Sequence, residues 1–193
     1  EETRIVTQSP LDEIEQLVRK FSLQIVTPEA TWQFENSLEN RLRELGRNVL
    51  EVVYNRLESH TADEMPKHVQ FEGYEYSCKN EKTRNRAGIG TVFGMIQLVR
   101  FSYEPLSEAR DDRQKSISPL ELSLGIVAGN ASPALAERVG RAASGHTQRE
   151  LLELLEREHR VRWSAKVLRR VTAAVSRGVA EHLHQAQKEQ LLA

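Results

Sequence analysis

The sequence predicts a mainly α-helical α+β fold that contains a small β-hairpin and ends in a helix-turn-helix-like unit. Apolar residues recur at three- and four-residue steps near both ends of the chain, whereas a central segment carries apolar side chains with period two. We therefore expect four regions: an N-terminal helical region at 1–60, a β-hairpin region at 61–104, a linker with short elements at 105–131, and a helical domain at 132–193.

Two helices are predicted in the first region. Residues 11–26 carry leucine, isoleucine, valine and phenylalanine at helical spacing, and Pro28 closes this segment. From Glu29 to about Ser59 an apolar stripe runs between glutamate and arginine residues, which is typical of a long amphipathic helix. The sequence thus predicts a short helix followed by a long one.

The central region is predicted to be extended chain. Aromatic residues surround Gly73, and a charged loop at 79–88 follows them. The segment from Thr91 to Tyr103 gives the clearest strand signal, because apolar side chains occupy both of its parities. Residues 104–118 lack a hydrophobic period, so we expect a solvent-exposed loop or hinge between the two halves of the chain.

Three helices are predicted in the last region. A Ser-Pro pair at 132–133 provides a helix cap and first turn. Thr147 and Glu150 have the spacing of a capping box and open a helix at 148–158. After a short interruption, Ser164 can cap a long final helix. The last two helices and their short connection have the arrangement of a helix-turn-helix.

Basic residues gather on one side of the predicted final helix. At 100° per residue, its four basic side chains up to position 177 fall within an arc of about 100°, opposite the valine and leucine stripe. No Asp or Glu occurs between 160 and 177. An ordinary solvated face of a helical bundle gives the same pattern, so both interpretations stay open. The candidate DNA-binding residues are Arg160, Arg162, Ser164, Lys166, Arg169, Arg170 and Arg177.

Composition restricts the class of protein. The formal net charge of −1 argues against a chain that is basic throughout, so a nucleic-acid site has to be a local patch. No apolar run approaches the roughly 20 residues that a membrane-spanning helix needs. The single cysteine, Cys78, excludes an internal disulfide and fits a reducing compartment, and no signal peptide is visible, so we expect a cytoplasmic protein without a membrane partner.

No catalytic centre is visible in the sequence. The neighbouring Asp111 and Asp112 lie in a polar loop, where adjacent carboxylates need not converge on a metal. His182 and His184 are two residues apart on a helix and therefore point to different sides. Cys78 lacks the further thiolates that a zinc site uses. We expect no metal and no cofactor in this chain.

Several stretches occur together in an informative order within about residues 31–180. They are Phe34–Leu38, Leu45–Arg47, Gly90–Tyr103, Pro119–Ile126, Ser132–Ala136 and the final helix pair. In pattern they resemble the N-terminal region of ISKra-type and ISLre-type insertion-sequence transposases. This resemblance implies a DDE catalytic domain beyond Ala193, and it implies that the helices at 148–158 and 164–180 position transposon DNA. Many transposases of these types carry several cysteines before the strand, whereas this chain has only Cys78.

These observations predict a non-catalytic portion of a transposase-like protein that binds double-stranded DNA. The alternative is a helical interaction module, in which the helix at 31–58 and the tail at 178–192 pair with another copy to form a homo-oligomer. The two interpretations differ in what they require of Lys166, Arg170 and Arg177. DNA binding requires these side chains to be exposed together, whereas assembly would bury them or pair them with carboxylates.

Overall fold

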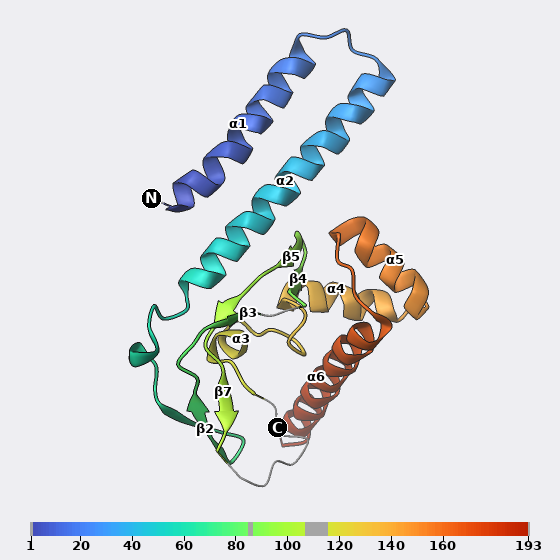
Figure 1. Ribbon diagram of the computed structural model, residues 1–193. Helices are drawn as coiled ribbons and strands as arrows, with labels where there is room; N and C mark the ends of the chain where they lie inside the picture. The colour runs from blue at the N-terminus through green and yellow to red at the C-terminus, as the bar shows by residue number, and fades with distance from the viewer. Residues whose placement is uncertain (1, 85–86, 107–115, 193) are drawn as a thin grey trace. The chain divides into compact units, whose positions relative to one another are not determined.

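A computed structural model describes residues 2–84, 87–106 and 116–192, with side chains described for 10–84, 87–106 and 116–181. The chain divides into two compact units, Glu1–Leu57 and Glu58–Ala193. The first unit contains the long helices α1 and α2, and the second combines short strands with helices (Figure 1). The predicted α+β combination, with more helix than strand, is confirmed.

The first unit is a hairpin of antiparallel helices, α1 (Glu2–Ser22) and α2 (Pro28–Arg56) (Figure 1). The rings of Phe21 and Phe34 stack between them, with their centroids 4.3 Å apart and an interplanar angle of 18°. Because these residues lie near the end of α1 and the beginning of α2, the stack fixes how the two helices meet at the closed end of the hairpin.

The two predicted N-terminal helices are confirmed, with different bounds for the first. The helix expected at 11–26 begins earlier and ends at Ser22. Thr27 cannot continue a helix because the following proline favours an extended conformation, which Thr27 adopts. Its hydroxyl instead accepts a hydrogen bond of 3.1 Å from the Ala30 N–H, so α2 begins with a capped turn.

Three helices of the second unit share one hydrophobic core: α4 (Pro133–Ala143), α5 (Gln148–His159) and α6 (Ala165–Leu192). Each of them is amphipathic and turns its apolar side towards the other two. The buried residues of this core are Ala131, Leu135, Ala136, Val139, Leu151, Leu155, Val161, Leu168 and Val171.

Local capping fixes where these helices start and stop. Ser132 accepts a hydrogen bond from the Leu135 N–H at 3.4 Å, and the capping box of Thr147 and Glu150 is formed in both directions. At the end of α5 the chain reverses through Arg160, whose backbone is left-handed with φ 50°. The predicted signals for these helices are therefore confirmed.

The remaining elements of the second unit are short and form three small sheets. A three-stranded antiparallel sheet has the order β1-β2-β7, and two-stranded sheets pair β3 with β6 and β4 with β5. These elements are a 3₁₀ turn η1 (Ala62–Glu64), β1 (His68–Phe71), β2 (Tyr74–Cys78), β3 (Thr83–Arg84), β4 (Ile89–Thr91), β5 (Gly94–Ile96), β6 (Val99–Arg100), β7 (Tyr103–Pro105) and the short helix α3 (Pro119–Ser123).

The prediction of one continuous strand from Thr91 to Tyr103 is wrong, because β4 to β7 share this segment. The chain turns back at once after Thr91, whose hydroxyl accepts from the Phe93 N–H (3.2 Å) and donates to the Gly94 carbonyl (2.8 Å). Gly94 has a φ of 126°, which favours glycine. Ile96 and Tyr103, which belong to opposite parities, are both buried because separate strands, β5 and β7, place them, and the sequence pattern does not show the breaks between strands.

Backbone hydrogen bonds join the strand region to the helical core. The Gly90 N–H donates to the Asn130 carbonyl, and the Gly90 carbonyl accepts from the Ser132 N–H, each at 2.8 Å. The Trp163 ring lies directly against Gly90, where a β-carbon would approach Cζ2 of the ring to 2.8 Å. Since Trp163 lies two residues before α6, this close packing fixes the beginning of α6 against β4.

Candidate nucleic-acid interface

The orientation of α6 in the core decides where its basic side chains point. Leu168 and Val171 are fully buried against α4 and α5. Ser164 stands just before the helix, where its hydroxyl accepts from the Val167 N–H at 3.4 Å and its carbonyl accepts from the Leu168 N–H at 3.1 Å. Ser164 therefore caps α6, and the side of the helix opposite the core is turned outward.

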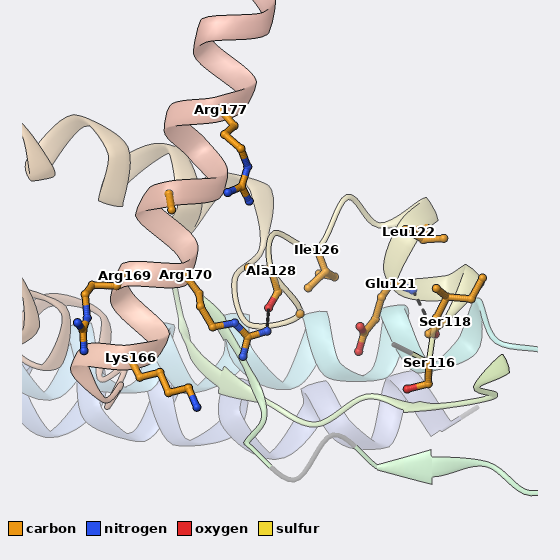
Figure 2. Close-up of a pocket in the computed structure, with 13 residues that line it drawn as sticks. Ser116, Ser118, Glu121, Leu122, Ile126, Ala128, Lys166, Arg169, Arg170 and Arg177 are labelled. Carbon is orange, nitrogen blue, oxygen red and sulfur yellow. Dashed lines mark hydrogen bonds between the residues drawn. The ribbon is translucent and has the colours of Figure 1, made fainter. Parts of the chain in front are cut away.

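A groove of about 890 Å³ runs along this outward side (Figure 2). One wall is α6, and the other is the segment that passes through α3 to the turn at 127–130. Lys166, Arg169, Arg170, Ala173 and Arg177 line the α6 wall. Ser116, Ile117, Ser118, Glu121, Leu122, Ile126, Ala128 and Gly129 line the other. Four of the seven predicted DNA-binding residues therefore lie along a single groove.

The cations of the α6 wall are exposed and keep donors available. None of the four forms an ion pair with a carboxylate in the part of the chain that the structure describes. Arg169 donates one hydrogen bond to the Ala165 carbonyl one turn earlier (3.3 Å), and Arg170 donates one to the Ala128 carbonyl (3.1 Å). A guanidinium has five N–H donors, so both can still bind an external anion.

Arg170 joins α6 to a turn on the far wall of the groove. Ala128 and Gly129 both have positive φ, 52° and 66°, which is an unfavourable backbone conformation for alanine. The Ala128 carbonyl accepts from Arg170 and also from the side-chain amide of Asn130, at 2.5 Å. These contacts stabilise the turn and set the width of the groove at this point.

Among its described residues, the far wall carries one carboxylate, Glu121, which is largely covered. Its Oε1 lies 2.5 Å from Nε of Arg100 as an ion pair, although neither atom forms a directed hydrogen bond. Burial raises the pKa of the Glu121 carboxyl, and the Arg100 guanidinium opposes this by a smaller amount. Glu121 is paired with Arg100, so among the described residues that line the groove the four cations of α6 are the dominant charge.

Arg160 and Arg162 lie outside the residues that line the groove. Arg160 forms the left-handed end of α5. Nε of Arg162 lies 2.7 Å from Oε1 of Glu156, which belongs to the preceding helix. The sequence window from 160 to 177 contains no carboxylate, but folding brings one to Arg162 from outside that window. These two arginines are therefore not part of the candidate interface formed by α6.

Reasoning from the sequence did not find the far wall. Residues 119–126 were expected only as short elements, and the contact between Arg170 and Ala128 spans 42 positions along the chain. Such a contact leaves no periodic signal. The signal that was present is the Ala-Gly-Asn run at 128–130 before the Ser132 cap, which marks a tight turn immediately before a helix.

Other sites considered from the sequence are not found among the described residues. No group of three or more His, Cys, Asp or Glu side chains converges there as a metal site. Asp111 and Asp112 lie outside the described residues, as do the side chains of His182 and His184. Within the same described ranges, every helix is too short or too polar to cross a membrane.

Comparison with known proteins gives no relative. No protein-family model, no curated protein and no solved structure matches the chain. The geometry of the groove and the physical chemistry of its residues are therefore the basis for a functional proposal.

Proposed function

We propose that this chain binds double-stranded DNA through the groove beside α6. The observation that carries the proposal is the set of four exposed cations along one wall, none of them paired with a carboxylate in the described ranges. Lysine and arginine side chains that neutralise backbone phosphates release condensed counterions, and this release drives binding. A neutral chain can bind DNA in this way because the charge is concentrated locally.

Within this proposal, α4, α5 and α6 act as a helix-turn-helix-like unit with α6 as the helix that meets DNA. The shared core of the three helices and the short connection between α5 and α6 support this assignment. Because the segment at 116–129 flanks the basic side of α6, contact with phosphates is easier than deep insertion into a major groove. We therefore expect affinity that depends little on base sequence.

We also propose a biological process for this binding, on the basis of the resemblance in sequence pattern to insertion-sequence transposases. We propose that the chain is a non-catalytic portion that positions transposon DNA for a DDE domain elsewhere in the protein. The concentration of unpaired charge on a helix next to a small hydrophobic core suits such a positioning role, because phosphate contacts fix register and orientation on the duplex.

The test is a fluorescence-anisotropy titration of labelled duplex DNA with the full chain. The triple variant Lys166→Ala, Arg170→Ala and Arg177→Ala is expected to lose at least about tenfold in affinity at low salt, because it removes three phosphate contacts. Circular dichroism confirms that the variant is folded. Absence of binding by the wild type at low salt, or equal binding by the folded variant, would overturn the proposal.

A matched control removes the same number of charges elsewhere. Arg141, Arg149 and Arg157 are exposed on α4 and α5, and each is paired with a neighbouring glutamate. Substituting all three by alanine changes the net charge as much as the groove variant does. We expect this control to bind DNA within about twofold of the wild type, since paired surface cations have less charge available for phosphate.

A further inference from the structure

The two walls of the groove beside α6 differ in chemistry. One wall carries the four exposed cations of α6, whereas the other is mostly apolar. The apolar side chains of this far wall are Ile117, Leu122, Ile126 and Ala128. Leu122 is 50% exposed, so it is available for contact with a bound molecule. A nucleic acid in this groove would therefore meet charge on one side and hydrocarbon on the other.

The polar groups of the far wall are mostly engaged within the protein. The buried hydroxyl of Ser118 accepts a hydrogen bond from the Glu121 N–H at 3.5 Å, and the Glu121 carboxylate is paired with Arg100. The Ala128 carbonyl already accepts two hydrogen bonds. Among the described residues of this wall, Ser116 has the only polar side chain that is exposed. A further hydroxyl placed against the wall would thus find few hydrogen-bond partners there.

A nucleic acid in this groove would be held by its backbone rather than by its bases. Proteins that bind bases in a basic groove stack them on aromatic side chains, and none of the described residues that line this groove is aromatic. The backbone alternates charged phosphates with uncharged sugars. When the phosphates contact the cations of α6, the sugars are left to face the far wall, where Figure 2 shows Ile126 between Arg170 and Glu121.

We propose that the far wall selects DNA against RNA, because Leu122 and Ile126 exclude the 2′-hydroxyl of ribose. This proposal rests on the binding of double-stranded DNA by the same groove. Deoxyribose presents a CH₂ group at C2′, which packs on these apolar side chains without losing a hydrogen bond. Ribose presents a hydroxyl there, which loses its water and gains no partner from either side chain. The 2′-hydroxyl is the group by which a protein distinguishes RNA from DNA at a given site.

The experiment measures the affinity of the full chain for three duplexes of one sequence and length by fluorescence anisotropy. One duplex is DNA, one is RNA, and one is RNA that carries fluorine in place of each 2′-hydroxyl. The fluorinated duplex keeps the A-form geometry of RNA but lacks the hydroxyl, so it separates the effect of the sugar from that of helix shape. We expect RNA to bind at least about fivefold more weakly than the fluorinated duplex, because a hydroxyl left without a partner weakens binding.

Two variants test whether the far wall is the source of this preference. Leu122→Asn replaces the leucine by an amide of similar size that can hydrogen-bond a 2′-hydroxyl. We expect this variant to reduce the preference for the fluorinated duplex over RNA by at least about threefold, and to bind DNA within about twofold of the wild type. Leu106→Asn is the matched control, because Leu106 is 46% exposed and does not line the groove. The control should keep the wild-type preference.

The outcomes distinguish a failure of this inference from a failure of DNA binding itself. Absence of DNA binding by the wild type would overturn both proposals. If DNA binds, equal binding of the RNA and fluorinated duplexes would overturn the selectivity alone, because the hydroxyl then has no effect. An unchanged preference in a folded Leu122→Asn variant would also overturn it. If that variant does not fold, the comparison of the three duplexes with the wild type still decides the question.

Discussion

The α1–α2 hairpin and the α4–α5–α6 core are built from similar amphipathic helices but differ in burial and in charge pairing. The hairpin has no buried side chain among residues 10–57, whereas Leu168 and Val171 of α6 are fully buried. In the hairpin, Arg19, Arg41 and Arg43 pair with nearby glutamates, but the arginines in the α6 groove have no such partners among the described residues. An amphipathic pattern therefore predicts a helix, but it does not predict how deeply the helix is buried or whether its charged side chains are paired.

The largest expected effect concerns burial. Leu168→Ala should lower the free energy of unfolding of the second unit by about 2–5 kcal/mol, because it leaves a cavity in a closed core. Leu17→Ala in α1 should cost no more than about 1 kcal/mol, because Leu17 is only half-buried. Urea unfolding measures both, with Trp163 fluorescence in a Trp32→Phe background reporting on the second unit. Equal losses would remove the contrast between the two regions.

A pair of glycine substitutions sharpens the comparison within the core helices. A β-carbon at Gly140 would lie 2.8 Å from Cγ1 of Val175, so Gly140→Ala should separate α4 from α6 and cost about 1–3 kcal/mol. Nothing lies within 4 Å of the corresponding position at Gly178, so Gly178→Ala should stabilise α6 by about 0.5–1 kcal/mol. Thermal unfolding of both variants gives the two signs, and a stabilising Gly140→Ala would disprove the close approach.

The smallest expected effect concerns the carboxylate in the groove wall. The pKa of the Glu121 carboxyl is raised in the folded protein, so the protonated carboxyl contributes to stability. This contribution is fully present below the ordinary pKa of 4.5 and is lost as the pH rises through the raised pKa. The side-chain amide of a Glu121→Gln variant does not titrate. The urea midpoint of the wild type relative to this variant should therefore fall as the pH rises from 4.5 towards neutrality. A difference between the two urea midpoints that stays constant with pH would show that burial does not raise the pKa of Glu121.

How far the sequence predicts the structure depends on whether its signals are local. The helix starts at Thr27, Ser132 and Thr147 follow from capping residues within three positions, so they could be predicted. The broken strands between Thr91 and Tyr103 could not, because the turns interrupt an apolar alternation that continues across them.

The candidate interface shows the same division between local and distant signals. The helical period places Lys166, Arg170 and Arg177 on one side of α6, and the structure finds them along one groove. The far wall with Glu121 and Ala128 arises from tertiary contacts, such as the hydrogen bond from Arg170 to Ala128. Arg162 was predicted to bind DNA, but folding pairs it with Glu156 and so separates it from the cations of the groove.

The salt dependence of DNA binding tests the central proposal most directly. With four phosphate contacts, the logarithm of the binding constant should fall with the logarithm of salt concentration with a slope of about −3 to −4. In the Lys166, Arg170 and Arg177 triple variant the slope should shrink by about 2 to 3, and in the Arg141, Arg149 and Arg157 control it should stay unchanged. Equal slopes for the wild type and both variants would contradict a phosphate-binding groove beside α6.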